Sequence, residues 1–175
     1  MMPAVALRPL FSSQAIAARV AALGEDVART IPAGELMVVG ILRGAFIFMA
    51  DLVRAIPREL RCDFLGVRSY GDATETSGVV QITSDLGSSV EGQHVLLVED
   101  IVDTGLTLKY LIEVLQARRP RSLHVCALLS KPDRRRVDVP VHFLGFEVPD
   151  VFVVGYGLDY NEKYRNLRDI VVYGS

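Results

Sequence analysis

The chain has 175 residues, of which 50% are hydrophobic, 7% aromatic and 23% charged. We expect one domain over residues 1–175, because this length and composition are typical of a single globular unit and exclude disordered and fibrous proteins. With 19 basic and 21 acidic residues the formal net charge is −2, so no overall positive field attracts nucleic acid, which is not expected as a partner.

The first residues, MMPAVALRPLFSSQ, lack a basic region followed by a long apolar run and a small-residue cleavage site. We therefore expect no signal peptide. All apolar runs are far shorter than the roughly 20 residues that span a bilayer, so no membrane contact is expected. Cys62 and Cys126 lie in apolar runs without metal-ligand spacing, which is typical of buried thiols in a reducing compartment. These features predict a cytoplasmic protein.

The first third of the chain alternates between helical and strand patterns. Residues 13–29 carry apolar side chains at helical spacing behind a serine that can cap the helix. Residues 35–42 form a continuous apolar run typical of a buried strand, and residues 44–56 return to a helical pattern that Pro57 ends. Residues 60–70 predict another strand.

A polar stretch interrupts this alternation. Residues 71–78, GDATETSG, are bounded by glycines and have no apolar face, so we expect a mobile loop that is poorly ordered without ligand over about residues 70–78. Residues 77–85 predict a more exposed strand, which places this loop in a hairpin-like excursion from the sheet.

The second half predicts a buried strand at residues 94–100, a helix at 106–119, and strands at 123–129, 141–148 and 151–157. Strands that are apolar on both faces and alternate with helices predict an α/β fold, in which helices flank a mainly parallel sheet. In such sheets, ligands bind at the carboxyl ends of the strands.

The segment from Val95 to Thr107 carries the most informative pattern. An apolar strand is followed by three acids, a glycine turn and the start of a helix. The free backbone N–H groups of such a turn can bind a phosphate, and Thr104 and Thr107 add hydroxyl donors. Acids beside a phosphate site are unfavourable unless they bind ribose hydroxyls or a cation, so the segment indicates a sugar phosphate. It lacks the Gly-Lys-Ser/Thr of ATP-binding loops and the GxGxxG of dinucleotide-binding folds.

The same segment resembles the phosphoribosyl pyrophosphate motif of type I phosphoribosyltransferases, with four hydrophobic residues, Glu99-Asp100, two hydrophobic residues, and Asp103-Thr104-Gly105 with Thr107. The resemblance extends over nearly the whole chain and narrows to the hypoxanthine-guanine branch. Residues 40–45 (GILRGA) resemble its pyrophosphate loop, residues 69–71 its closing loop, and Lys131 with residues 151–162 its purine pocket.

This resemblance implies the type I phosphoribosyltransferase fold with a small hood. The implied enzyme is a glycosyltransferase of purine salvage, which transfers the 5-phosphoribosyl group from phosphoribosyl pyrophosphate to a 6-oxopurine. Hypoxanthine and guanine would give IMP and GMP, with pyrophosphate as the other product. Relatives form dimers or tetramers, so a homodimer or homotetramer is expected.

The resemblance also implies roles for the sugar-phosphate residues. Glu99 and Asp100 would hold the ribose hydroxyls, directly or through Mg²⁺, and Asp159 would contact magnesium pyrophosphate. The 5′-phosphate would bind at Asp103, Thr104, Gly105, Leu106 and Thr107. Asp103 is also the candidate general base or acid for a proton on the five-membered ring of the purine.

The purine and pyrophosphate contacts follow from the same resemblance. Lys131 would donate to the 6-oxo group, Phe152 would stack on the base, and the Val153 main chain would meet the purine 2-position. Pyrophosphate would bind at Arg43, Gly44, Ser69, Tyr70 and Arg165. Arg43 stands where many relatives carry lysine, and a guanidinium suits a phosphate equally well.

Two other functions stay open at this point. Some proteins with this motif are regulators that bind RNA or DNA, and the arginine runs 118–121 and 134–136 could serve that purpose. We interpret these runs as solvated connections, and a complete purine pocket argues against a regulator. A pyrimidine or xanthine phosphoribosyltransferase is the other alternative, and the sequence does not rank hypoxanthine, guanine and xanthine. His94, His124 and His142 share no metal spacing and are assigned to edge or core positions.

Overall fold

The computed structural model describes residues 6–70 and 79–174, without the side chains of residues 69, 70 and 79. The loop expected over residues 70–78 therefore lies outside the described residues, apart from the backbone of Tyr70. Within the described ranges, no helix is long and apolar enough to cross a membrane.

A six-stranded sheet with the order β4-β3-β2-β5-β6-β7 forms the centre of the fold. The five strands from β3 to β7 in this order run parallel, and β4 pairs antiparallel with β3 at one edge. The bounds are β2 (Leu36–Leu42), β3 (Arg61–Tyr70), β4 (Val79–Ser84), β5 (His94–Val102), β6 (Ser122–Ser130) and β7 (Phe143–Glu147). The prediction of a mainly parallel α/β fold is confirmed.

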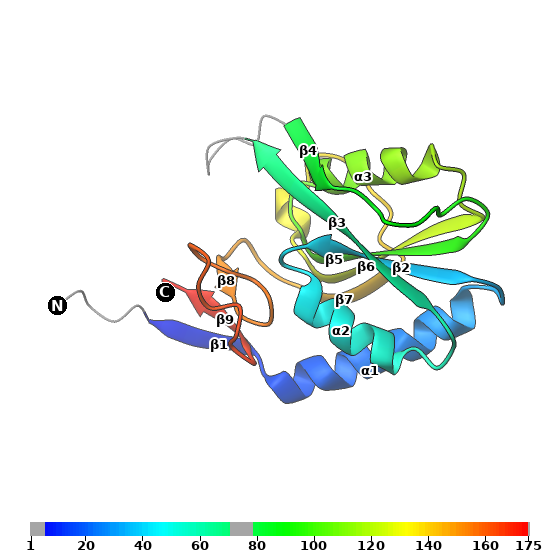
Figure 1. The fold of residues 1–175 in the computed structure, drawn as a ribbon. Coiled ribbons are helices and arrows are strands. Elements are labelled where there is room, and N and C mark those ends of the chain that lie inside the picture. Colours follow the sequence, from blue (N-terminus) through cyan, green and yellow to red (C-terminus); the bar gives the residue numbers. More distant parts are fainter. Residues whose placement is uncertain (1–5, 71–78, 175) are drawn as a thin grey trace.

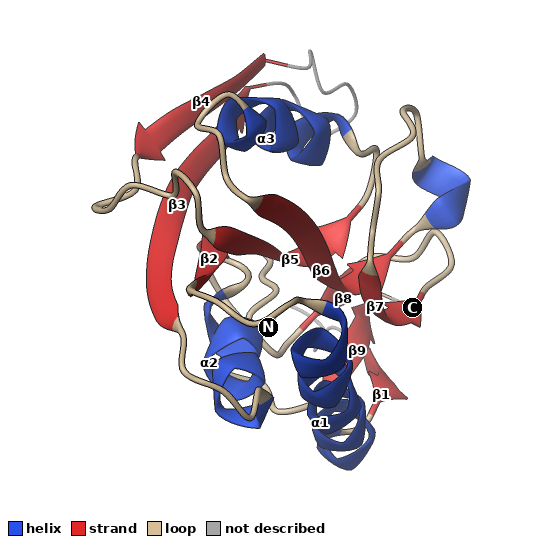
Figure 2. Cartoon of the chain, turned by 90° about the vertical axis from the view of Figure 1, so that its right-hand side faces the viewer, coloured by secondary structure: helices blue, strands red, loops and turns tan. Residues whose placement is uncertain are grey.

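Helices cover both faces of this sheet, as Figures 1 and 2 show. The helices α1 (Ser13–Thr30) and α2 (Phe46–Ala55) lie on one face, and α3 (Leu106–Gln116) lies on the other. Side chains that alternate along β2 enter opposite cores, Val38 packing with the α1 and α2 residues and Val39 with those of α3. Burial on both faces explains why the central strands read as continuous apolar runs.

A second sheet, of three strands, stands beside the carboxyl end of β2 (Figure 1). It has the order β1-β9-β8, with β1 (Leu7–Phe11), β8 (Val153–Val154) and β9 (Ile170–Tyr173). Neither β1 nor β9 was predicted. β1 is short, largely exposed and interrupted by a proline, and it is stabilised by antiparallel pairing with the far end of the chain. The mostly buried run Ile170–Tyr173 of β9 does have a strand pattern, which was overlooked. The strand predicted at 151–157 is reduced to the two residues of β8.

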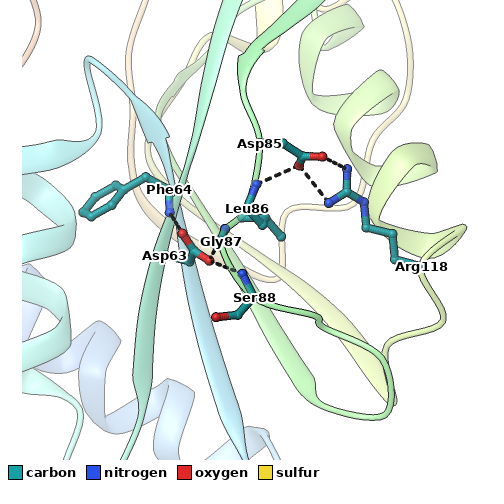
Figure 3. Close-up of polar contacts among 7 residues, drawn as sticks. All are labelled: Asp63, Phe64, Asp85, Leu86, Gly87, Ser88 and Arg118. Atoms are coloured by element: carbon teal, nitrogen blue, oxygen red, sulfur yellow. Dashed lines mark hydrogen bonds and ion pairs between the residues drawn. The ribbon is translucent and has the colours of Figure 1, made fainter.

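The base of the β3–β4 hairpin is fixed by two carboxylates (Figure 3). Asp63 accepts hydrogen bonds from the backbone N–H groups of Phe64, Gly87 and Ser88, at 2.8, 3.0 and 3.2 Å. Asp85 accepts two from the Arg118 guanidinium, at 2.8 and 3.0 Å. These contacts tie the segment after β4 to β3 and to the chain beyond α3.

Both cysteines were predicted to be buried, and one of them is not. Cys126 is buried in the core, as expected, and burial raises the pKa of its thiol. Cys62 is exposed, because it lies in the first half of β3, where Arg61 and Phe64 are exposed as well. The prediction that both are buried is wrong for Cys62.

Candidate active site

Two cavities meet at the carboxyl end of β5. The first has a volume of about 230 Å³ and is lined by Gly44, the acids of the motif and the turn before α3. The second, of about 430 Å³, is lined by Lys131, Phe152, Val153 and Asp159 among others. Asp100, Ile101 and Asp103 line both cavities. The residues predicted for the ribose phosphate and for the purine are therefore neighbours.

The turn before α3 has the geometry of an anion site. Gly105 is the N-cap of α3 with φ at 85°, a left-handed conformation that a residue with a side chain rarely adopts. The Thr104 carbonyl accepts from the backbone N–H groups of residues 136 and 137, at 3.0 and 3.3 Å, which braces the turn from behind. The Leu106 N–H donates a long hydrogen bond of 3.4 Å to Thr104 Oγ1, and the first N–H groups of a helix have no acceptor within the helix itself, so this turn can bind a phosphate. Thr104, Gly105 and Thr107 line the first cavity, whereas Leu106 does not.

Glu99 and Asp100 form an adjacent pair of acids, of which Glu99 is buried and Asp100 partly buried. The exposed fraction of Glu99 is 8%. Burial raises the pKa of Glu99 well above its ordinary value, and the Asp100 charge raises it further. Burial likewise raises the pKa of Asp100, against hydrogen bonds that lower it. Two desolvated carboxylates side by side favour a bound cation, which would offset their repulsion.

This acid pair fits magnesium better than a metal that needs a full protein cage. Among the described residues, no group of three or more histidine, cysteine or acidic side chains could hold a metal by itself. Mg²⁺ commonly takes one or two carboxylates and completes its shell with water and substrate phosphates. The oxygen donors of Glu99 and Asp100 match that requirement.

The backbone at Gly44 presses directly against the acid pair. A Cβ atom built on Gly44 would lie 1.7 Å from Oδ2 of Asp100, far inside any allowed contact. A Cβ on Gly157 would lie 2.3 Å from the Gly44 carbonyl oxygen. Two glycines thus let the segment at Gly44 approach the Asp100 carboxylate on one side and the segment at Gly157 on the other. Gly44 was assigned to the pyrophosphate loop from the sequence, and neither close contact was predicted.

Arg43, Arg165, Asp159 and Glu162 form a charged cluster beside the cavities. Arg43 Nη1 donates to Glu162 Oε2 at 2.8 Å, and Arg165 Nη2 lies 3.0 Å from Asp159 Oδ1. The other Asp159 oxygen accepts from the Glu162 N–H at 2.8 Å. Neither arginine lines either cavity. Buried Nε of Arg165 has no hydrogen-bond partner in the described part of the chain. For Ser69 and Tyr70, only the backbone at the end of β3 is described.

The second cavity combines one buried cation with one open aromatic face. Lys131 has an exposed fraction of only 8%, and its backbone N–H donates to the Val102 carbonyl of β5 at 2.9 Å. Phe152 is half exposed, and its ring meets Tyr160 and Tyr173 edge-on, with centroids at 5.8 and 6.0 Å. A flat, polar heterocycle could stack on this ring while the ammonium group meets a carbonyl oxygen.

Two charged residues of this cavity were missed. Arg134 and Asp150 both line it, and Arg134 Nε donates to Asp103 Oδ1 at 3.0 Å. Arg135 Nη2 donates to Ser130 Oγ at 2.7 Å. The interpretation of the run 134–136 as a solvated connection is therefore wrong for Arg135, which is partly buried, whereas Arg134 is exposed at the cavity wall. The spacing could have revealed Arg134, since it lies one turn beyond Lys131 behind a proline.

The sequence of this chain is similar to those of known phosphoribosyltransferases. The family described as phosphoribosyl transferase domain matches residues 9–161. A hypoxanthine-guanine phosphoribosyltransferase of Mycobacterium avium is 47% identical, over 92% of this chain and 82% of the relative. A hypoxanthine phosphoribosyltransferase of Haemophilus influenzae is 48% identical, over 90% of each chain.

A solved crystal structure of a related enzyme is similar to this chain in fold and in sequence. The crystal structure of a hypoxanthine phosphoribosyltransferase from Staphylococcus aureus is similar, with a TM-score of 0.91 and 44% identity over 95% of this chain and 90% of that one. The fold, the turn with its acid pair and these relatives agree, and the chain belongs to the hypoxanthine-guanine phosphoribosyltransferases of the type I phosphoribosyltransferase family.

Proposed function

We propose that the two joined cavities transfer the 5-phosphoribosyl group from phosphoribosyl pyrophosphate to hypoxanthine or guanine, as a step of purine salvage. The observation that carries this proposal is the sharing of Asp103 between the two cavities, one with an anion-binding turn and the other with Lys131 and Phe152. Ribose and base must meet at one carbon atom, and the shared wall is where such a meeting would occur. Residues 1–175 act as one domain in this proposal.

The first cavity holds the sugar phosphate. The amides and hydroxyls from Asp103 to Thr107 bind the 5′-phosphate at the start of α3, with Leu106 contributing through its backbone. Glu99 and Asp100 bind the two ribose hydroxyls. Hydroxyl donors and a cation satisfy these acids, whose burial would otherwise be unfavourable.

The second cavity holds the purine. The Lys131 ammonium donates to the 6-oxo group, Phe152 stacks on the ring, and the Val153 main chain meets the 2-position. An exocyclic amine at the 6-position would set donor against donor, so adenine is rejected. Asp103 lies between base and ribose, where its carboxylate can accept or return a proton on the five-membered ring.

Magnesium would be held by Glu99 and Asp100, with Asp159 contributing towards the pyrophosphate. When bound, the ion neutralises the charge on the leaving pyrophosphate. The protein's own cations for this product are Arg43 and Arg165, together with the backbone at Gly44 and the closing residues Ser69 and Tyr70. Support comes from the charged cluster, in which acidic partners hold both arginines beside the cavities.

The protein as a whole is proposed to act in the cytoplasm, as a homodimer or homotetramer. Its partners are the two substrates, without membrane or nucleic acid. All the proposed substrate contacts come from one chain, so the proposed chemistry does not depend on the assembly.

A substrate panel tests the proposal. The purified protein is incubated with phosphoribosyl pyrophosphate, Mg²⁺ and, in parallel, hypoxanthine, guanine, xanthine, adenine or uracil, and nucleotide formation is followed by chromatography. We expect IMP and GMP and no nucleotide from adenine or uracil. Turnover of uracil or adenine in preference to 6-oxopurines would overturn the roles of Lys131 and Phe152. Absence of any turnover would favour a regulator.

A further inference from the structure

Arg134 lies between two carboxylates in the wall of the purine cavity. Its Nε is 3.0 Å from Oδ1 of Asp103 and 3.8 Å from Oδ1 of Asp150. The same Asp150 oxygen lies 3.8 Å from Nζ of Lys131. Two cations and two anions thus alternate along one wall, from the residue proposed to move a proton to the residue proposed to read the 6-oxo group.

The backbone before Arg134 fixes the direction of its side chain. Lys131 directly precedes a short 3-10 helix, η1 (Pro132–Arg134). The Arg134 N–H donates to the Lys131 carbonyl oxygen at 3.1 Å. The ring of Pro132 restricts the first residue of this turn. Lys131 is itself bound to the end of β5. The turn therefore returns Arg134 towards Asp103, which follows the same strand.

The contact with Arg134 engages one oxygen of Asp103 and leaves the other open. Within the described residues, Oδ2 of Asp103 has no hydrogen-bond partner, while Oδ1 accepts from Arg134. An aspartate held through one oxygen loses rotational freedom, and the other oxygen keeps a defined direction. A proton-transfer group gains rate from such pre-orientation, because small displacements of reacting groups cost large factors.

We infer that Arg134 is a positioning residue for Asp103, which orients the free carboxylate oxygen towards the purine in the second cavity. The inference rests on the proposed proton-transfer role of Asp103. Asp150 completes the arrangement as a second carboxylate near the same Nε atom and near Lys131. A purine that engages Lys131 thereby meets an Asp103 carboxylate that is already oriented.

The alternative is that Arg134 and Asp103 form an ordinary surface ion pair without a role in catalysis. The positioning role and the surface ion pair predict different effects of removing Arg134. The side chains of Arg134 and Asp103 are 43% and 41% exposed, and pairs this exposed contribute little to stability. A surface pair would therefore affect neither stability nor rate when removed. A positioning residue would affect the chemical step and leave stability and binding of the sugar phosphate almost unchanged.

The experiment compares Arg134→Ala, Arg134→Lys, Asp103→Asn and the double variant Arg134→Ala/Asp103→Asn. Arg29→Ala serves as the matched control, because it removes another exposed arginine-aspartate pair, in α1 and away from both cavities. The single-turnover rate of IMP formation reports the chemical step, steady-state assays give KM for both substrates, and thermal unfolding gives Tm.

We expect Arg134→Ala to lower the single-turnover rate by about 10-fold to 10²-fold, with KM for phosphoribosyl pyrophosphate within about twofold of the wild type. Arg134→Lys should recover part of the rate, because it restores a cation beside Asp103. In the Asp103→Asn background, Arg134→Ala should add no further loss, since the positioned group is already gone.

A wild-type rate for Arg134→Ala would overturn the inference, as would a loss of equal size in both backgrounds. A wild-type rate for Asp103→Asn would overturn both the proton-transfer role and this inference. IMP formation by the wild-type enzyme would leave the transferase function itself standing in each of these cases.

Discussion

A single methyl group at Gly44 should separate catalysis from stability. In Gly44→Ala the new Cβ would start 1.7 Å from Oδ2 and 2.6 Å from Cγ of Asp100. Real Cβ atoms essentially never lie closer than 3.0 Å to another heavy atom, so the carboxylate must move by more than 1 Å. It stands at the end of a side chain that can rotate, and we expect the protein to remain folded. A displacement of about 1 Å at a reacting centre can cost about 10²-fold in rate.

The assay for this variant is IMP formation from hypoxanthine, with thermal unfolding measured on the same preparation. We predict a loss in kcat/KM of about 10²-fold and a Tm close to that of the wild type. Gly87→Ala is the matched control, because its nearest neighbour to a new Cβ is 3.9 Å away, and it should behave as the wild type. Normal activity in Gly44→Ala would refute the placement of Asp100 in the reaction site.

Four further predictions follow from the site and the core. Asp103→Asn should lower kcat and kcat/KM together by about 10² to 10⁴-fold, whereas Lys131→Ala should mainly raise KM for the purine; steady-state kinetics with both substrates separates the two. Excess chelator should abolish IMP formation and added Mg²⁺ should restore it, and full activity in chelator would contradict the metal role of the acid pair. Asp63→Ala should lower the free energy of unfolding by about 1–3 kcal/mol, since three backbone donors lose their acceptor, as urea titration can measure. Burial lowers the pKa of His94 below its ordinary value of 6.5, so the unfolded chain binds more protons and stability should fall as the pH drops below 6.5; urea midpoints between pH 8 and 5 should decline less in His94→Gln.

Local patterns made the central part of this protein predictable. The run from Val95 to Thr107 specifies a buried strand, a glycine turn and a helix through neighbouring residues, and the structure contains all three. The helix at residues 13–29 is likewise local, with Ser12 as its N-cap. His94 and the other two histidines lie at core or edge positions, as expected.

Contacts between residues far apart in the chain could not be predicted from the sequence. The strand β1 exists because Leu7 pairs with Tyr173 at the other end of the chain, and β1 has no strand pattern of its own. Arg134 meets Asp103 only because β5 and β6 lie side by side. The close approach of Gly44 to the Asp100 carboxylate similarly depends on the neighbouring ends of β2 and β5. These are tertiary effects, which residue spacing along one segment cannot encode.

The most direct test is a crystal structure of the protein with IMP, at a concentration that saturates the enzyme. We expect the 5′-phosphate at the backbone N–H groups of residues 104–107, the ribose hydroxyls at Glu99 and Asp100, and the 6-oxo group at Lys131 with Phe152 stacked on the base. A nucleotide bound with its phosphate away from the turn before α3, or with its base outside the cavity lined by Lys131 and Phe152, would contradict it.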